Sequence, residues 1–298
     1  MSEIILEINN LNKHFGKVHA VNNLSLEIKR GQVFGILGPN GSGKTTTLGM
    51  ILGVTTPDSG NYKWFGENPS PAVRRKIGAI LEHPNFLPYL SARENLKVIC
   101  QIRGVDYSDI DRVLKLVDLK HRERSLFKTY SYGMKQRLAI AAALLGDPGV
   151  LILDEPTNGL DPTGIAEVRE LIRNIAATDK TIIMASHLLD EVQKICSHVM
   201  VIHNGVKLQT SSVDEITGSG HKVEIEANEL VSPEKFMDDK SIITDYTRDH
   251  KKFVCTLAEG KTPEDLNSYF FSHGVVLRRI NPIHQTLEQH FLALLKDD

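Results

Sequence analysis

An uninterrupted eight-residue pattern sets the strongest constraint on how this chain folds. Residues 38–45 match G-x-x-x-x-G-K-[ST] at every position and read Gly38-Pro39-Asn40-Gly41-Ser42-Gly43-Lys44-Thr45. An apolar run at residues 33–37 predicts a buried strand before the pattern, and residues 46–52 continue it as a helix. Gly41 and Gly43 permit the positive φ values that a sharp turn between the two needs. A glycine-rich turn that matches by chance does not account for the flanking strand and helix.

This loop has the chemistry of a phosphate site. Successive backbone N–H groups point into one concavity, and the helix that follows presents its positive end there. We therefore predict an α/β fold whose loop binds a polyphosphate. Lys44 is expected to reach the terminal phosphates, and the Thr45 hydroxyl is expected to coordinate Mg²⁺.

A second apolar run, at residues 150–153, is typical of a parallel strand covered on both faces and ends in Asp154-Glu155. Carboxylates at the end of a buried strand cost free energy unless a cation or a reaction uses them. We predict that Asp154 holds Mg²⁺ and that Glu155 orients or deprotonates an attacking water. The alternative is a strand that runs into an acidic helix cap.

One of the twelve histidines follows a third predicted strand, at residues 181–185. This residue, His187, is predicted to donate a hydrogen bond to the γ-phosphate. A single histidine after a strand is more often structural, so this role depends on the other motifs.

Together these residues resemble the ATP-binding subunit of an ABC transporter over residues 3–217. Residues 130–137, Tyr130-Ser131-Tyr132-Gly133-Met134-Lys135-Gln136-Arg137, are similar to the family's signature loop. Asp154-Glu155-Pro156-Thr157 and Asn158-Gly159-Leu160-Asp161 resemble its catalytic carboxylates and dimer-contact loop, and His187 resembles its switch histidine.

The resemblance implies a homodimer that sandwiches two ATP molecules, each between the phosphate loop of one subunit and the signature loop of the other. Lys44, Glu155 and His187 would be catalytic, and Thr45, Asp154 and Glu82 would hold Mg²⁺. Phe15 falls where the family stacks an aromatic ring on adenine, although it is also compatible with an edge-strand core residue. The implied ATP-binding set is Phe15, Gly38, Pro39, Asn40, Gly41, Ser42, Gly43, Lys44, Thr45, Thr46, Ser131, Gly133 and Met134.

Three residues depart from the family pattern. Tyr132 replaces a usual glycine, and Met134 replaces a usual glutamine. Glu82 replaces a glutamine that reaches Mg²⁺, and a carboxylate ligates this hard cation well but donates no N–H bond. Glu82 and the segment 91–96 resemble exporters of the drug-resistance and bacteriocin-immunity type.

The composition is ordinary for a globular protein, with 24% charged and 41% hydrophobic residues in 298. A net charge of −2 gives no electrostatic case for nucleic acid as a partner. Three separated cysteines indicate a reducing compartment rather than a disulfide framework. No apolar run approaches the roughly 20 residues that span a bilayer, and no signal peptide is evident. We therefore expect a peripheral protein on the cytoplasmic face of the membrane, with a polytopic permease on a separate chain.

The chain is expected to form an ABC-type ATP-binding domain at residues 1–217, with a mixed sheet core and a helical lobe at about 84–140. Within that lobe, the aromatic segment 84–90 is either a contact for the membrane partner or a plain loop. A linker at 217–220 leads to a small α+β accessory domain at 221–298. Strands are predicted at 223–227, 253–257 and 275–277, a helix from Pro263, and an amphipathic helix at the end.

The predicted function is an ATPase subunit that powers transport, with export as the expected direction. Two alternatives remain. A non-transport ABC ATPase is one, although ribosome-acting members carry two cassettes and DNA-acting members insert coiled coils, and neither pattern is found. A regulatory module that uses ATP only as a dimerisation signal is the other.

Overall fold

The computed structural model describes residues 3–81, 85–218, 222–227, 233–249, 252–283 and 286–295. The chain divides into two compact units, Met1–Ser211 and Ser212–Asp298. The predicted linker began at residue 217, whereas the structure assigns helix α8 (Val213–Thr217) to the second unit.

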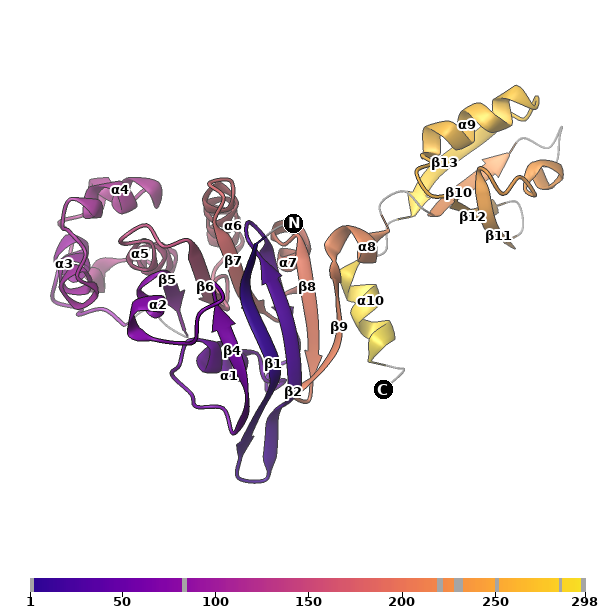
Figure 1. Ribbon diagram of the computed structural model, residues 1–298. Coiled ribbons are helices and arrows are strands. Elements are labelled where there is room, and N and C mark those ends of the chain that lie inside the picture. The colour runs from indigo at the N-terminus through magenta and orange to yellow at the C-terminus, as the bar shows by residue number, and fades with distance from the viewer. Residues whose placement is uncertain are drawn as a thin grey trace. The chain divides into compact units, whose positions relative to one another are not determined.

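The first unit contains two sheets (Figure 1). A three-stranded antiparallel sheet has the order β2-β1-β4, with β1 (Ile4–Phe15), β2 (Val18–Lys29) and β4 (Ser59–Trp64). A six-stranded sheet has the order β5-β6-β7-β3-β8-β9, with β5 (Ile77–Ile80), β6 (Val150–Asp154), β7 (Thr181–Ser186), β3 (Val33–Leu37), β8 (His198–His203) and β9 (Val206–Ser212). Every residue of β3, β6 and β7 is buried, as parallel pairing between covered strands requires. The predicted α/β class is confirmed, and β9 is a strand that the sequence did not indicate.

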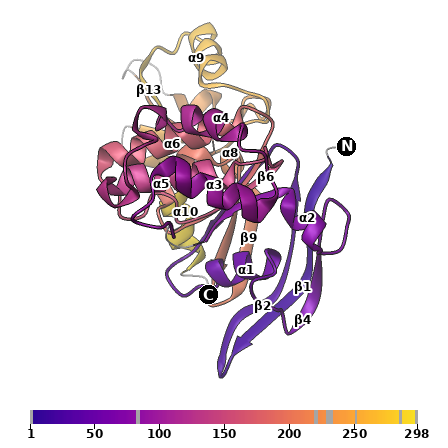
Figure 2. The same ribbon diagram turned by 90° about the vertical axis from the view of Figure 1, so that its left-hand side faces the viewer.

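Helices of the first unit fall into two groups. The helices α1 (Lys44–Ile51), α2 (Pro71–Arg75), α6 (Pro162–Ala176) and α7 (Leu189–Ile195) connect strands of the sheets. The helical lobe contains α3 (Ala92–Arg103), α4 (Asp109–Leu116), α5 (Tyr132–Ala143) and the 3₁₀ turns η1 (Lys120–Arg122) and η2 (Phe127–Thr129). Figure 2 shows α3, α4 and α5 gathered on one side, away from β1, β2 and β4. None of the described helices is both long enough and apolar enough to traverse a bilayer.

The hydrophobic core of the first unit connects the two sheets. Fully buried side chains from both sheets and from α1 form one cluster, which includes Leu6, Phe34, Leu48 and Trp64. The indole N–H of Trp64 donates to the Ile51 carbonyl over 2.8 Å, so the largest core residue is also satisfied as a donor. This core fixes α1, and therefore the phosphate loop at its N-terminus, against the strands.

The second unit is an α+β domain built on a four-stranded antiparallel sheet in the order β11-β12-β10-β13. Its strands are β10 (Lys222–Ala227), β11 (Ile243–Asp249), β12 (Lys252–Leu257) and β13 (Leu277–Ile283). Its other elements are η3 (Pro233–Phe236), α9 (Pro263–Ser272) and α10 (Leu287–Leu294). The strand order is that of a split βαβ fold in which a 3₁₀ turn stands where the first helix is usual.

The sequence predicted most of these elements, with one error and two omissions. The strand expected at 275–277 begins only at Leu277, because Val275 precedes it and belongs to the buried cluster under α9. Strand β11 and helix α8 were not predicted, since β11 alternates weakly in the sequence and α8 has only five residues.

Candidate functional site

The phosphate loop has the predicted backbone. Gly41 and Gly43 have φ values of 79° and 108°, which a side chain disfavours. A Cβ on Gly43 would also lie 2.3 Å from the carbonyl oxygen of Ala20. Helix α1 begins directly after Gly43, and Thr47 donates back to the Gly43 carbonyl over 2.9 Å. The N–H groups of the first turn therefore remain available to an anion, as at any helix N-terminus.

Two side chains of this loop show that it fits a polyphosphate. The Ser42 hydroxyl is buried and has no hydrogen-bond partner among the residues that the structure describes. The ammonium of Lys44, whose side chain is only 6% exposed, donates to the carbonyls of Gly38 and Pro39 over 2.9 and 3.2 Å. A buried hydroxyl and a buried cation, both held at a helix N-terminus, are the donors that phosphate oxygens require.

Glu155 connects the phosphate loop to His187. One carboxylate oxygen of Glu155 lies 3.4 Å from Lys44 Nζ, and the other lies 2.9 Å from His187 Nδ1. The three side chains thus form a continuous charged and hydrogen-bonded series. The sequence predicted each of them separately, and the structure brings them together.

Pairing of two parallel strands produces this arrangement. Residue Asp154 ends β6 opposite Ala185 of β7, so Glu155 and His187 leave the sheet at the same edge. The Glu155 N–H donates to the Ala185 carbonyl over 2.9 Å, and its φ is 48°. A positive φ is costly for a residue with a side chain, and such strain is concentrated at functional sites.

The predicted Mg²⁺ ligands are only partly placed by the structure. Asp154 is 4% exposed at the end of β6, and Thr45 lies in the first turn of α1. Glu82 lies outside the described residues. Within the described ranges no cluster of three or more His, Cys, Asp or Glu side chains gathers as a metal site. A hydroxyl in the first turn of α1 and a carboxylate at the end of β6 are nevertheless oxygen ligands of the kind that a hard cation takes together with phosphate oxygens.

The signature loop lies at the start of α5. Ser131 is the N-cap residue and accepts a hydrogen bond from the Met134 N–H over 3.2 Å. A Cβ on Gly133 would meet nothing nearer than Leu160 Cδ2 at 3.8 Å, so no described neighbour requires glycine there. No hydrogen bond between described residues joins Ser131 or Gly133 to the phosphate loop. Within the described part of one chain, hydrogen bonding therefore does not join the two predicted parts of the ATP site.

Phe15 ends β1 and is 52% exposed, which excludes the core interpretation. Lys13 Nζ lies 5.4 Å from the centroid of that ring and pairs with Asp58 at 2.8 Å. The hydrogen bond from Lys13, together with the His14 backbone N–H and imidazole, lowers the pKa of Asp58 to about 2. An ion pair thus anchors the strand end that presents Phe15.

The aromatic segment of the helical lobe is organised by a residue to which the sequence analysis assigned no role. The buried amide of Asn95 in α3 accepts from the Leu87 N–H and donates to the carbonyls of Leu87, Leu90 and Ser91. Leu87 and Tyr89 remain 40% and 66% exposed. In the sequence, the signal for this role of Asn95 is a polar amide beside the apolar positions of an amphipathic helix.

The parallel sheet, the phosphate loop and the carboxylate at the adjacent strand end define a class of nucleoside triphosphate-binding proteins. Residues 21–158 match the family model described as "ABC transporter". The bacitracin transport ATP-binding protein BcrA of Bacillus licheniformis is 37% identical over 98% of this chain and 97% of its own length. The lantibiotic transport ATP-binding protein SrtF of Streptococcus pyogenes is 39% identical over 76% of this chain and 98% of its own.

Solved structures agree. The structure of cbiO1 from Clostridium perfringens, part of the ABC transporter complex cbiONQ, has a TM-score of 0.67 and 30% identity, and the match covers 72% of this chain and 91% of that one. The dimeric structure of the bacterial ABC transporter cassette MJ0796 is 24% identical and shares the fold, with a TM-score of 0.63. The match covers 70% of this chain and 99% of that one.

The chain belongs to the ABC transporter ATP-binding proteins. It is the ATP-binding subunit of such a transporter and an ATPase whose hydrolysis drives transport. Subunits of this family work with other components of a transporter complex.

Proposed function

We propose that this subunit powers the export of a peptide antibiotic of the bacitracin or lantibiotic kind through a separate polytopic membrane subunit. Named relatives act on bacitracin and on lantibiotics, and a Nod factor export protein of Cupriavidus metallidurans is 39% identical over 72% of this chain. The match to BcrA covers 98% of this chain. The match to SrtF covers 98% of SrtF but only 76% of this chain. The second unit therefore supports a BcrA-like assignment.

The observation that carries the catalytic proposal is the series Lys44–Glu155–His187. Glu155 would accept the proton of the attacking water, and His187 would hold the γ-phosphate. Lys44 would exchange the loop carbonyls for phosphate oxygens, which are stronger acceptors because they are charged. The other residues of the phosphate loop and Phe15 would bind the rest of ATP.

Mg²⁺ held by Thr45, Asp154 and Glu82 would neutralise charge on the β- and γ-phosphates. The protein's own contribution would be to fix these oxygens at the edge of the sheet and to hold Glu155 on the side of the incoming water. Glu82 remains a prediction from the sequence alone.

The proposed active form is a homodimer that closes on ATP. No described residue links Ser131 or Gly133 to the phosphate loop by a hydrogen bond, and an uncrowded Gly133 at a helix N-terminus permits close approach of a phosphate from a second subunit. The exposed aromatic segment at residues 85–90 is the proposed contact for the membrane partner, since aromatic side chains anchor interfaces. We place the protein on the inner face of the membrane, and the division into an ATP-binding and an accessory domain near residues 211–221 remains part of this proposal.

Purification of the tagged native chain from membranes in mild detergent tests the proposal. We expect a polytopic membrane protein in the complex, ATPase activity in the purified material, and loss of antibiotic resistance when the gene is deleted. The variant Lys44→Ala should keep the partner and lose ATP binding. Recovery of a ribosome, a DNA complex or no partner would refute the transport assignment and favour a non-transport ATPase. A native complex without hydrolysis would favour the regulatory module.

A further inference from the structure

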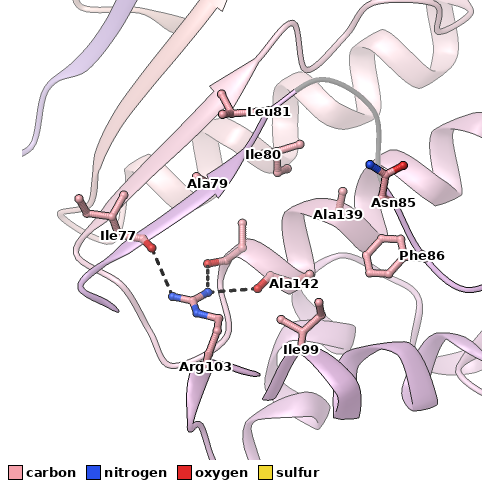
Figure 3. Close-up of a pocket in the computed structure, with 11 residues that line it drawn as sticks. Ile77, Ala79, Ile80, Leu81, Asn85, Phe86, Ile99, Arg103, Ala139 and Ala142 are labelled. Atoms are coloured by element: carbon pink, nitrogen blue, oxygen red, sulfur yellow. Dashed lines mark hydrogen bonds between the residues drawn. The ribbon is translucent and has the colours of Figure 1, made fainter. Parts of the chain in front are cut away.

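The guanidinium of Arg103 joins the helical lobe to the edge of the parallel sheet. Arg103 ends α3 and lines a cavity of about 390 Å³ between α3, α5 and β5 (Figure 3). Its Nη1 donates to the carbonyls of Ala142 and Ala143 over 3.3 and 3.0 Å. Its Nη2 lies 3.4 Å from the Ile77 carbonyl and 3.5 Å from that of Arg75.

The two sets of carbonyls belong to different parts of the unit. Ala142 and Ala143 end α5, where the carbonyls carry partial negative charge, and the Ala142 carbonyl also accepts a long bond of 3.4 Å from the Leu145 N–H. Ile77 begins β5, and Arg75 ends α2. Arg103 therefore holds the end of α5, the helix that begins at the signature loop, on β5, the strand that precedes Glu82 in the sequence.

A second contact shows that the end of α5 rests directly on β5. A Cβ on Gly78 would lie 2.1 Å from the carbonyl oxygen of Ala143. The backbones touch there, and Arg103 closes over the same point. The contact and the guanidinium together make a fixed point for α5.

Burying the guanidinium of Arg103 costs more free energy than a purely structural role requires. Burial lowers the pKa of its guanidinium. In the described part of the chain it forms no direct ion pair, and its charge is compensated by the four carbonyl dipoles and, without contact, by the Asp109 carboxylate. Most other residues that line the cavity are apolar, and an apolar side chain would fill this wall at lower cost.

Arg112 offers a matched comparison. It also caps α5, because its Nη2 donates to the Leu144 carbonyl over 2.9 Å. Its other partners are Asp109, which begins α4, and Asp147, which follows α5. Arg112 therefore stabilises the end of α5 without connecting it to β5.

We propose that Arg103 is a positioning residue for the ATPase reaction, which fixes α5 on β5 and thereby sets where Ser131 and Gly133 are presented to ATP on a second subunit. This rests on the proposed closed dimer. The twelve residues of α5 span about 18 Å, so a tilt of about 3° at the fixed end moves Ser131 by about 1 Å. A misplacement of about 1 Å can lower a rate by about a hundredfold.

The test compares Arg103→Ala, Arg103→Lys and Arg112→Ala in the full-length chain. For each we measure ATP affinity by titration, hydrolysis at saturating ATP, and thermal unfolding. The phosphate loop lies in the other part of the unit, so ATP affinity should stay within about twofold in all three variants. Hydrolysis should fall by about ten- to a hundredfold in both Arg103 variants, because a lysine ammonium cannot span both sets of carbonyls. Arg112→Ala should keep its rate within about twofold despite a lower unfolding temperature.

Arg103→Lys keeps the charge and most of the aliphatic stem, so it decides the matter if Arg103→Ala does not fold. Wild-type hydrolysis in Arg103→Lys would overturn the proposal. An equal loss in Arg112→Ala would also overturn it, because capping alone would then explain the effect. A wild-type chain that binds ATP without forming a dimer would instead refute the proposed closed dimer, and this inference with it.

Discussion

Replacing Glu155 with glutamine separates the chemistry of the site from its stability. Glutamine has nearly the same shape, and its amide oxygen can still accept from His187 Nδ1, which lies 2.9 Å from the carboxylate. The change removes the negative charge 3.4 Å from Lys44 Nζ. It also removes the proton acceptor that the proposed mechanism needs.

The two consequences differ in size. Lys44 keeps its bonds to the Gly38 and Pro39 carbonyls, so the loss in free energy of unfolding should be about 1.5 kcal/mol, the order of one charge-assisted contact. At about 2–4 °C per kcal/mol for a domain of this size, the unfolding temperature should fall by about 3–6 °C. Loss of a general base lowers a rate by about 10²–10⁴-fold, which corresponds to about 3–5 kcal/mol in activation free energy.

Steady-state phosphate release, ATP titration and thermal unfolding of the full-length variant check these values. Glu123→Gln is the matched control, because Glu123 is also a carboxylate that pairs with a lysine, Lys120, and with Arg93, but it lies in the helical lobe. We expect Glu155→Gln to bind ATP, to accumulate as a closed dimer and to hydrolyse slowly, with Glu123→Gln unchanged in rate. Hydrolysis by Glu155→Gln within about threefold of wild type would refute the assignment of Glu155 as the base.

Three further predictions concern other parts of the first unit. Phe15→Ala should weaken ATP binding by about tenfold or more while Phe15→Tyr does not, since stacking on a base is worth about 1–3 kcal/mol, and equal affinities in a fluorescence titration would exclude the stacking role. Gly78→Ala should destabilise the unit by more than about 3 kcal/mol in denaturant unfolding, because its Cβ would overlap the Ala143 carbonyl; a loss below about 1 kcal/mol would show that the contact yields easily. The hydrogen bond from Lys13 is the main cause that lowers the pKa of Asp58 from 3.8 to about 2, so Asp58 should stabilise the fold above about pH 4 and lose this contribution as the pH falls toward 2. Asp58→Asn should therefore flatten that part of the acid-unfolding curve. An unchanged slope would contradict the ion pair.

The sequence predicted local structure well where a few neighbouring residues decide it. The phosphate loop and the strand predicted at 150–153 follow from glycine conformations and an apolar run, and the structure has both of them. It failed where the signal is short or shared with loops, as for β9, β11 and α8.

The chain's residues alone therefore determined the class of the protein and the list of candidate site residues, because the motifs are contiguous and act through backbone geometry that neighbours along the chain impose. Tertiary structure decided which candidates meet. Strand pairing between β6 and β7 sets Glu155 beside His187, although 32 positions separate them. Packing of the helical lobe on β5 sets Arg103 across the end of α5. Such contacts depend on strand order and on the position of a lobe, which are long-range properties that no local pattern encodes.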